Sequence, residues 1–172
     1  MEVMEAIKAA RRVSAFKPQP VPEQKLTAVL GAARLADSVE NTQPWKFTVV
    51  TDEDLKMKLA GACNGIRGFW DAPVVVVACV RMDDATAVVG GFTNSYPMDV
   101  GRAIAYLSVA AAGEGLGTAW VHAFNEDKVK ALLGVPATDH VLGLTPLGYP
   151  EAYAPPEGRK HLNEIVSYNR FD

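Results

Sequence analysis

Residues 34–50 contain the polar side chains of this chain that are best suited to bind a small molecule. The stretch ends a predicted helix, crosses a polar turn and enters a predicted strand, and Ser38, Asn41 and Gln43 lie in the turn shortly before Trp45. Because each Asn or Gln amide offers a donor and an acceptor, two amides and a hydroxyl beside a large aromatic ring suit the polar edge of a flat heterocycle. Ser and Asn are also ordinary turn residues, so a capped connection without a ligand explains the same pattern.

Three further polar positions have an ordinary explanation of their own. Arg11 and Arg12 adjoin the end of the first predicted helix, where cations complement the helix dipole. His122 stands in a predicted strand-to-helix turn, where a lone histidine is usually packed or solvent-facing. Arg159 and Lys160 form a basic pair in a proline-rich tail, which is typical of a solvated surface. None of these positions identifies a reaction by itself.

Three sequence motifs resemble those of the FMN-dependent nitroreductase family. Residues 36–45, ADSVENTQPW, are similar to the family's A-P-S-x-x-N-x-Q-P-W signature, with Asp37 in place of its proline. Residues 115–120, GLGTAW, match its G-L-G-T-x-W, and residues 121–124, VHAF, are similar to its I-G-A-F, with His122 where many relatives have glycine. The resemblance runs over nearly the whole chain.

The resemblance implies that the chain binds FMN at these motifs. Ser38, Asn41 and Gln43 would hold the ring and the ribityl edge. The backbone amides around His122 and Ala123 would approach the flavin N5. Beside a flavin, a histidine that titrates near neutral pH is a candidate proton donor. No side chain need act as a nucleophile, so His122 is the single candidate for a catalytic side chain.

The family's phosphate-binding pattern, R-R-S-V-R-x-F, is only partly kept. Aligning it on Phe16 places Arg11 on the second arginine, whereas Ala10, Arg12 and Ser14 replace the first arginine, the serine and the last arginine. By resemblance, Arg11, Arg12 and Arg159 would hold the phosphate. The last arginine usually lies near the pyrimidine side of the ring, where a cation would stabilise a reduced anionic flavin. Ser14 cannot supply that charge, although Arg12 is near enough in sequence to reach inward, so the affinity and potential of the flavin are left open.

Composition indicates a soluble, cytoplasmic protein of one domain, residues 1–172. Lys and Arg number 17 against 20 Asp and Glu, and no basic stripe points to nucleic acid. Cys63 and Cys79 lack metal-ligand spacing and suggest reduced thiols. The amphipathic N-terminus differs from a signal peptide, and the longest apolar run, residues 72–80, is too short to cross a bilayer. No metal site is predicted.

The periodicity of apolar residues predicts the elements that position these motifs. Helices are expected at residues 2–10, 22–36, from 51 onward, 98–112 and from a cap at Asn125 to Gly134. Strands are expected at 45–50, 74–80, 118–121 and 141–147. Residues 64–68 read as a loop and 81–91 as a polar, mobile segment. The tail from about 151 is expected to be extended. The helix at 98–112 is apolar on every side, which predicts burial all round, part of it against a second subunit.

The predicted fold is α+β: a nitroreductase-like three-layer sandwich with a central mixed, mainly antiparallel sheet. By resemblance it is a homodimer with the flavin at the subunit interface. The predicted function is an FMN-dependent NAD(P)H oxidoreductase. It would pass hydride in a ping-pong mechanism from NADH or NADPH to a small-molecule acceptor such as a nitro compound or quinone. A non-catalytic flavin-binding protein, either a carrier or a redox sensor, is the alternative that the altered positions Arg12 and Ser14 favour. A third reading is a member with specialised chemistry, such as flavin breakdown or reductive dehalogenation, although such relatives usually have extra lid sequence.

Overall fold

The computed structural model describes residues 1–63 and 71–171, so the loop expected at 64–68 lies outside the described residues. The helices are α1 (Val3–Ala9), α2 (Glu23–Arg34), α3 (Glu53–Ala62), α4 (Tyr96–Gly113) and α5 (Glu126–Leu133). The strands are β1 (Val13–Phe16), β2 (Trp45–Val50), β3 (Val74–Val80), β4 (Val88–Val89), β5 (Thr93–Asn94), β6 (Gly117–Thr118), β7 (His140–Gly148) and β8 (Pro150–Tyr153). Short 3-10 turns are η1 (Val39–Asn41), η2 (Met82–Asp84) and η3 (Leu162–Glu164).

The main sheet has the strand order β2-β3-β7-β6, and each neighbouring pair is antiparallel. Strand β3 is buried along its whole length, as the unbroken apolar run predicted. Strands β1 and β8 pair in a second small sheet. An isolated parallel bridge between Arg12 and Thr118 joins this small sheet to the main one and makes the arrangement mixed.

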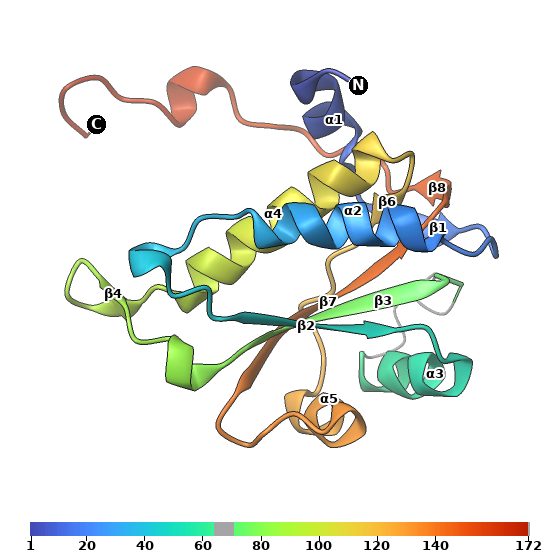
Figure 1. Cartoon of the computed structure of the whole chain (residues 1–172). Helices are drawn as coiled ribbons and strands as arrows, with labels where there is room; N and C mark the ends of the chain where they lie inside the picture. The colour runs from blue at the N-terminus through green and yellow to red at the C-terminus, as the bar shows by residue number, and fades with distance from the viewer. Residues whose placement is uncertain (64–70, 172) are drawn as a thin grey trace.

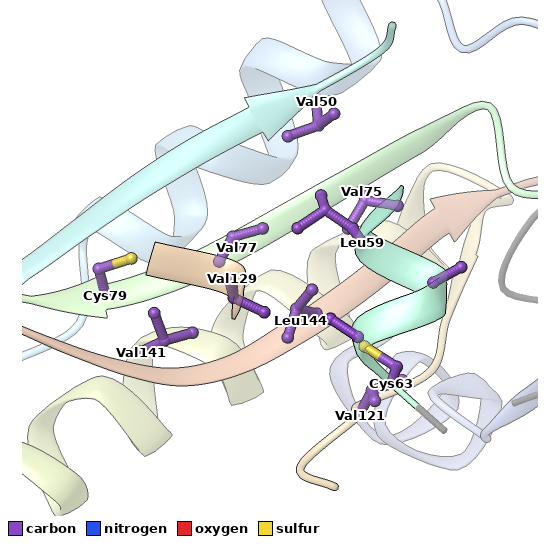
Figure 2. Close-up of a cluster of buried hydrophobic side chains, with 12 residues drawn as sticks. Val50, Leu59, Cys63, Val75, Val77, Cys79, Val121, Val129, Val141 and Leu144 are labelled. Atoms are coloured by element: carbon purple, nitrogen blue, oxygen red, sulfur yellow. The ribbon is translucent and has the colours of Figure 1, made fainter. Parts of the chain in front are cut away.

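Helices cover both faces of the sheet and produce three layers (Figure 1). Helices α2 and α4 pack on one face, and α3 and α5 pack on the other. Figure 2 shows the apolar cluster beneath α3 and α5, in which Val77 and Leu144 from the two central strands meet Leu59 and Val129 from the two helices. The α+β three-layer prediction is confirmed. This cluster and the one beneath α2 and α4 both form because the central strands present apolar side chains to both faces of the sheet.

Local signals explain where α3 begins and where α5 begins and ends. The Asp52 side chain accepts a hydrogen bond from Leu55 N at 2.8 Å and caps α3. Asn125 caps α5 in the same way through Lys128 N at 2.9 Å. Gly134 ends α5 with φ of 67°, in the left-handed region that glycine adopts without a steric penalty. These ends follow from short-range hydrogen bonding alone.

The structure differs from the sequence predictions in several elements. On α4, Met98 and Tyr106 are 42% and 47% exposed in the single chain, so the part of the burial expected against a second subunit stays a prediction. The strand expected at 118–121 stops at Thr118, and Val121 makes only an isolated bridge to Leu144. Strands β1, β4, β5 and β8 were not predicted, because two to four residues carry too little periodicity to be recognised. Residues 81–91, where no helix or strand was predicted, include η2 and β4.

One buried cation was also not predicted. Lys56 on α3 is 2% exposed, and its Nζ donates to Ala72 O at 2.8 Å and pairs with Glu53 at 2.9 Å. It lines a cavity of about 540 Å³, to which Pro18 and Val74 also contribute. None of the side chains predicted to bind a ligand is among the described residues that line this cavity.

Candidate functional site

The structure brings Ser38, Asn41 and Gln43 together in one hydrogen-bonded cluster. Gln43 N donates to Ser38 Oγ at 2.9 Å, so the serine closes the turn across five residues. Gln43 Nε2 donates to Asn41 Oδ1 at 3.1 Å and to Asn41 O at 3.3 Å. We call residues 38–43 the amide turn. Its three predicted side chains hold one another in place, which fixes their orientation before any ligand arrives.

The backbone of the amide turn is held in a conformation that most residues avoid. Glu40 and Asn41 have φ of 56° and Gln43 has φ of 47°. Left-handed backbone is uncommon for residues other than glycine and is tolerated best by Asn and Asp. Strained residues of this kind cost about 1–3 kcal/mol each and cluster at ligand sites. The strain therefore favours a functional turn over a plain connection.

Arg11, Arg12 and Ser14 lie on the strand edge that leads from α1 into β1, and all three are exposed. We call residues 11–14 the arginine segment. Arg11 Nη2 donates to Ala154 O at 3.2 Å, and its guanidinium carbon lies 5.1 Å from the centroid of the Tyr153 ring, so this cation is tied to β8. The Arg12 side chain makes no hydrogen bond or ion pair with any described residue. Its charge is therefore open to an anionic ligand.

His122 and Ala123 are exposed directly after the bridge that anchors Val121 to β7. The His122 ring packs edge-on against Trp120, with the ring centroids 6.1 Å apart. The Trp120 indole in turn lies against Gly143, where an added Cβ would collide with Trp120 Nε1. Within the described part of the chain, the backbone N–H groups of His122 and Ala123 have no hydrogen-bond acceptor. Two adjacent donors are thus presented at the surface.

Arg159 does not join the other arginines within this protomer. Its Nη1 donates to Glu157 O at 3.3 Å and Gly158 O at 3.2 Å, both in its own segment. Residues 155–171 are exposed throughout, and the tail runs past α1 and away from the sheet (Figure 1).

The amide turn and the arginine segment lie at different ends of α4 (Figure 1). Val39 N in the turn donates to Asp99 Oδ1 in the first part of α4 at 3.1 Å. Arg12 bridges to Thr118, whose Oγ1 donates to Ser108 Oγ further along the helix at 3.2 Å. At a rise of ~1.5 Å per residue, Asp99 and Ser108 are about 14 Å apart along α4. The two halves of the predicted site are therefore well separated within one chain.

Sequence reasoning missed two residues beside the amide turn. Asp99 is fully buried, and Arg102 lies 3.3 Å from Asp99 and 3.4 Å from Asp37. The sequence did contain a signal in Asp99, which with Arg102 is one of two charged residues in a helix of mostly apolar or small residues. Its partner could not be identified, since Val39 is 60 residues away in the chain.

The two cysteines lie in the apolar core, away from these groups. Burial raises the pKa of the Cys63 thiol to about 11. Burial, together with the nearby Asp139 and Glu126 carboxylates, raises the pKa of Cys79 to about 11 as well. Such thiols are poor nucleophiles at neutral pH. Among residues 1–63 and 71–171, no group of His, Cys, Asp and Glu is arranged to hold a metal ion, and no helix is both long and apolar enough to span a bilayer.

Comparison with known proteins gives consistent matches along the chain. The family model described as "Nitroreductase family" matches residues 7–66 and 67–149. A Thermus thermophilus protein named NADH dehydrogenase is 30% identical over 198 aligned residues, which cover 96% of this chain and 97% of that protein. The crystal structure of a nitroreductase family protein from Clostridium novyi NT is 32% identical, with a TM-score of 0.81, and covers 88% of this chain and 86% of that chain.

A third relative shares the fold at lower sequence identity. The structure of the NADPH:FMN oxidoreductase from Vibrio harveyi, complexed with NAD+, is 22% identical with a TM-score of 0.87. The match covers 99% of this chain and 78% of that one.

Proposed function

Because this chain belongs to the nitroreductase family, a family of NAD(P)H oxidoreductases, we propose that it is an FMN-dependent enzyme that passes hydride from NADH or NADPH to a small acceptor. The acceptor would be a nitro compound, a quinone or a similar small molecule, and reductant and acceptor would occupy the same place in turn. The Vibrio harveyi protein, which shares the fold, is named for FMN. The stronger support comes from the residues themselves.

The amide turn fits the edge of a flavin ring. Among the described residues, Asn41 Nδ2 and Gln43 Oε1 make no hydrogen bond, so one donor and one acceptor remain for a ligand. The pyrimidine edge of a flavin has carbonyl acceptors and an N–H donor, which match that pair. This arrangement of two amides, held by Ser38 in strained backbone, is the observation on which the proposal chiefly rests.

The arginine segment would hold the phosphate. Arg12 makes no competing side-chain contact in the described structure, whereas Arg11 is partly committed to Ala154 and Tyr153. Arg12 is therefore the principal phosphate ligand in this proposal, and Arg11 and Arg159 support it. Guanidinium groups suit this role because their planar donors match phosphate oxygens. Ser14, exposed on β1, contributes a hydroxyl and no charge.

When bound, FMN would supply the redox chemistry, because its N5 accepts hydride from nicotinamide and returns it to the acceptor. The chain contributes binding and orientation. The backbone N–H groups of His122 and Ala123 would donate toward the N5 side of the ring. The His122 imidazole, steadied by Trp120, is the candidate to give a proton to the reduced acceptor.

The protein would act as a homodimer with the flavin site at the subunit interface. Met98 and Tyr106 expose an apolar face of α4, and Val3, Met4 and Ile7 do the same on α1, which packs against α4. Exposed apolar side chains on two helices that pack together are typical of an interface. The exposed tail is suited to lie over the partner. A dimer would also bring cations and amide turns of different chains into one site.

The first experiment is the visible spectrum of the purified protein, recorded before and after adding FMN and desalting. Retained flavin bands, bleached by NADH under anaerobic conditions, are the expected result. Steady-state oxidation of NADH and NADPH with menadione or a nitroarene then tests turnover.

Flavin that is retained but does not cycle would favour the alternative of a carrier or redox sensor, to which the missing charge at Ser14 points. A colourless protein that does not retain added FMN would refute both readings.

A further inference from the structure

Asp99 is a carboxylate in the first turn of α4 that is buried among apolar residues. It is fully buried on α4, between Met98 and Val100, and its Oδ1 accepts a hydrogen bond from Val39 N at 3.1 Å. Residues 38–43 make no other hydrogen bond to any distant part of the described chain. Asp99 is thus the hydrogen-bonding link between the amide turn and the body of the protein.

Arg102, one turn further along α4, places a positive charge beside the buried Asp99 carboxylate. Its Nη1 lies 3.3 Å from Asp99 Oδ1 and 3.4 Å from Asp37 Oδ2. A buried carboxylate without a nearby cation is strongly unfavourable, and Arg102 is the cation that lies beside Asp99. Asp37 precedes the turn and is 75% exposed, so its pairing with Arg102 is screened by solvent and is expected to matter less.

The junction between α4 and the amide turn is not optimised for stability alone. Three buried oxygens, Thr42 Oγ1, Ser95 Oγ and Asp99 Oδ2, lack a hydrogen-bond partner within the described residues. They lie on both sides of this junction, in the turn and in the first part of α4. Apolar side chains would cost less there, so polar groups retained at the junction indicate a role other than packing.

We propose that Asp99, held by Arg102, is a positioning residue for the flavin-binding turn. Its hydrogen bond to Val39 N would keep Glu40, Asn41 and Gln43 in their strained, left-handed backbone, so that the two amides meet the ring edge already oriented. This inference rests on the proposed function for its ligand, but the restraint on the turn is a property of the protein without ligand. The restraint on the turn and the binding of FMN can therefore be measured separately.

The test compares five variants by two measurements. Asp99→Ala removes the acceptor, Asp99→Asn keeps an acceptor but loses the charge, and Arg102→Met removes the cation. Asp37→Ala removes only the exposed partner. Lys130→Met is the matched control, because it breaks a 3.3 Å ion pair with Glu126 on α5, across the sheet from the turn. Hydrogen exchange is followed in the peptide covering residues 37–44 without FMN, and FMN affinity is followed by fluorescence quenching.

Asp99→Ala is expected to speed exchange in this peptide and to weaken FMN binding by about tenfold each, the loss of one hydrogen bond to a charged group. Asp99→Asn should restore slow exchange and much of the affinity. Arg102→Met should fall between these two, and Asp37→Ala should resemble the wild type and Lys130→Met. If Asp99→Ala fails to fold, Arg102→Met decides the test. It should show faster exchange in residues 37–44 and weaker FMN binding than Asp99→Asn and Lys130→Met.

Exchange in residues 37–44 that matches the Lys130→Met control in both Asp99 variants would overturn the inference. So would faster exchange spread evenly over the whole chain, because that indicates a general loss of stability. A wild-type protein that does not bind FMN while Asp99→Ala still loosens the turn would refute the proposed function alone. Unchanged FMN affinity with a loosened turn would refute the positioning role alone.

Discussion

The separation of the amide turn from the arginine segment leads to a prediction about how the two protomers of the proposed homodimer would share one site. Two double variants are made, R11A/R12A in the arginine segment and N41A/Q43A in the amide turn. Each change removes two ligand contacts, and hydrogen bonds to charged groups are worth about 1.5–3 kcal/mol each. For the arginine variant this corresponds to a loss of FMN affinity of more than about a hundredfold. The turn variant removes neutral amides and is expected to lose at least about tenfold.

The two variants are then co-expressed with different tags, and the heterodimer is isolated by two affinity steps. If each site takes its arginines from one protomer and its amide turn from the other, the heterodimer has one intact site and one site with both defects. About half of the wild-type FMN content and turnover should return, because a two-fold dimer contains two equivalent sites.

The control is a heterodimer of the wild type with R11A/R12A, which should show half the wild-type FMN content whichever way the site is shared. Heterodimers of the two variants that bind no more FMN than the parent homodimers would show that both halves of a site come from one chain. That result would contradict the reasoning from the spacing of about 14 Å along α4, at ~1.5 Å per residue.

Four further predictions concern the sheet and the apolar core. Gly148→Ala should destabilise the protein by about 1–3 kcal/mol in thermal unfolding, because the new Cβ would lie 2.6 Å from Pro73 Cδ; an unchanged melting temperature would show that this contact can relax. Leu144→Ala, at a fully buried position in the central strand, should cost about 2–5 kcal/mol by denaturant unfolding. Cys63 and Cys79 should resist alkylation at pH 8 until the protein is unfolded, and rapid labelling of the native protein would contradict their burial. Because folding raises both thiol pKa values to about 11, the stability they contribute is present below pH 9 and is lost as the pH rises towards 11, which unfolding measurements across that window can follow.

Elements defined by short-range physics could be predicted from the sequence. Strands β2 and β3 follow from their β-branched and apolar residues, and the observed bounds Trp45–Val50 and Val74–Val80 are those predicted. The caps at Asp52 and Asn125 and the left-handed stop at Gly134 depend only on residues within one helical turn. The sequence also predicted that Ser38, Asn41 and Gln43 lie in one turn, although the roles of their side chains are a proposal.

Contacts between residues distant in the sequence could not be predicted in this way. Strand β1 is four residues long and has no periodicity that marks it, and it forms because β8 supplies hydrogen-bond partners near the other end of the chain. Which residues of α4 would be covered within the chain could not be predicted, because hydropathy indicates which residues avoid water and not which surface covers them.

The sequence by itself determined which residues are available for chemistry: two amides in a tight turn, paired arginines after a helix and a histidine after a strand. The tertiary structure decided how they are held. It set Asp99 against Val39 across 60 residues of chain, tied Arg11 to Ala154 and left the Arg12 side chain without a partner among the described residues. The physical reason is that local propensity acts over one or two turns of backbone, whereas the burial and pairing of a charged group depend on the residues that folding brings beside it.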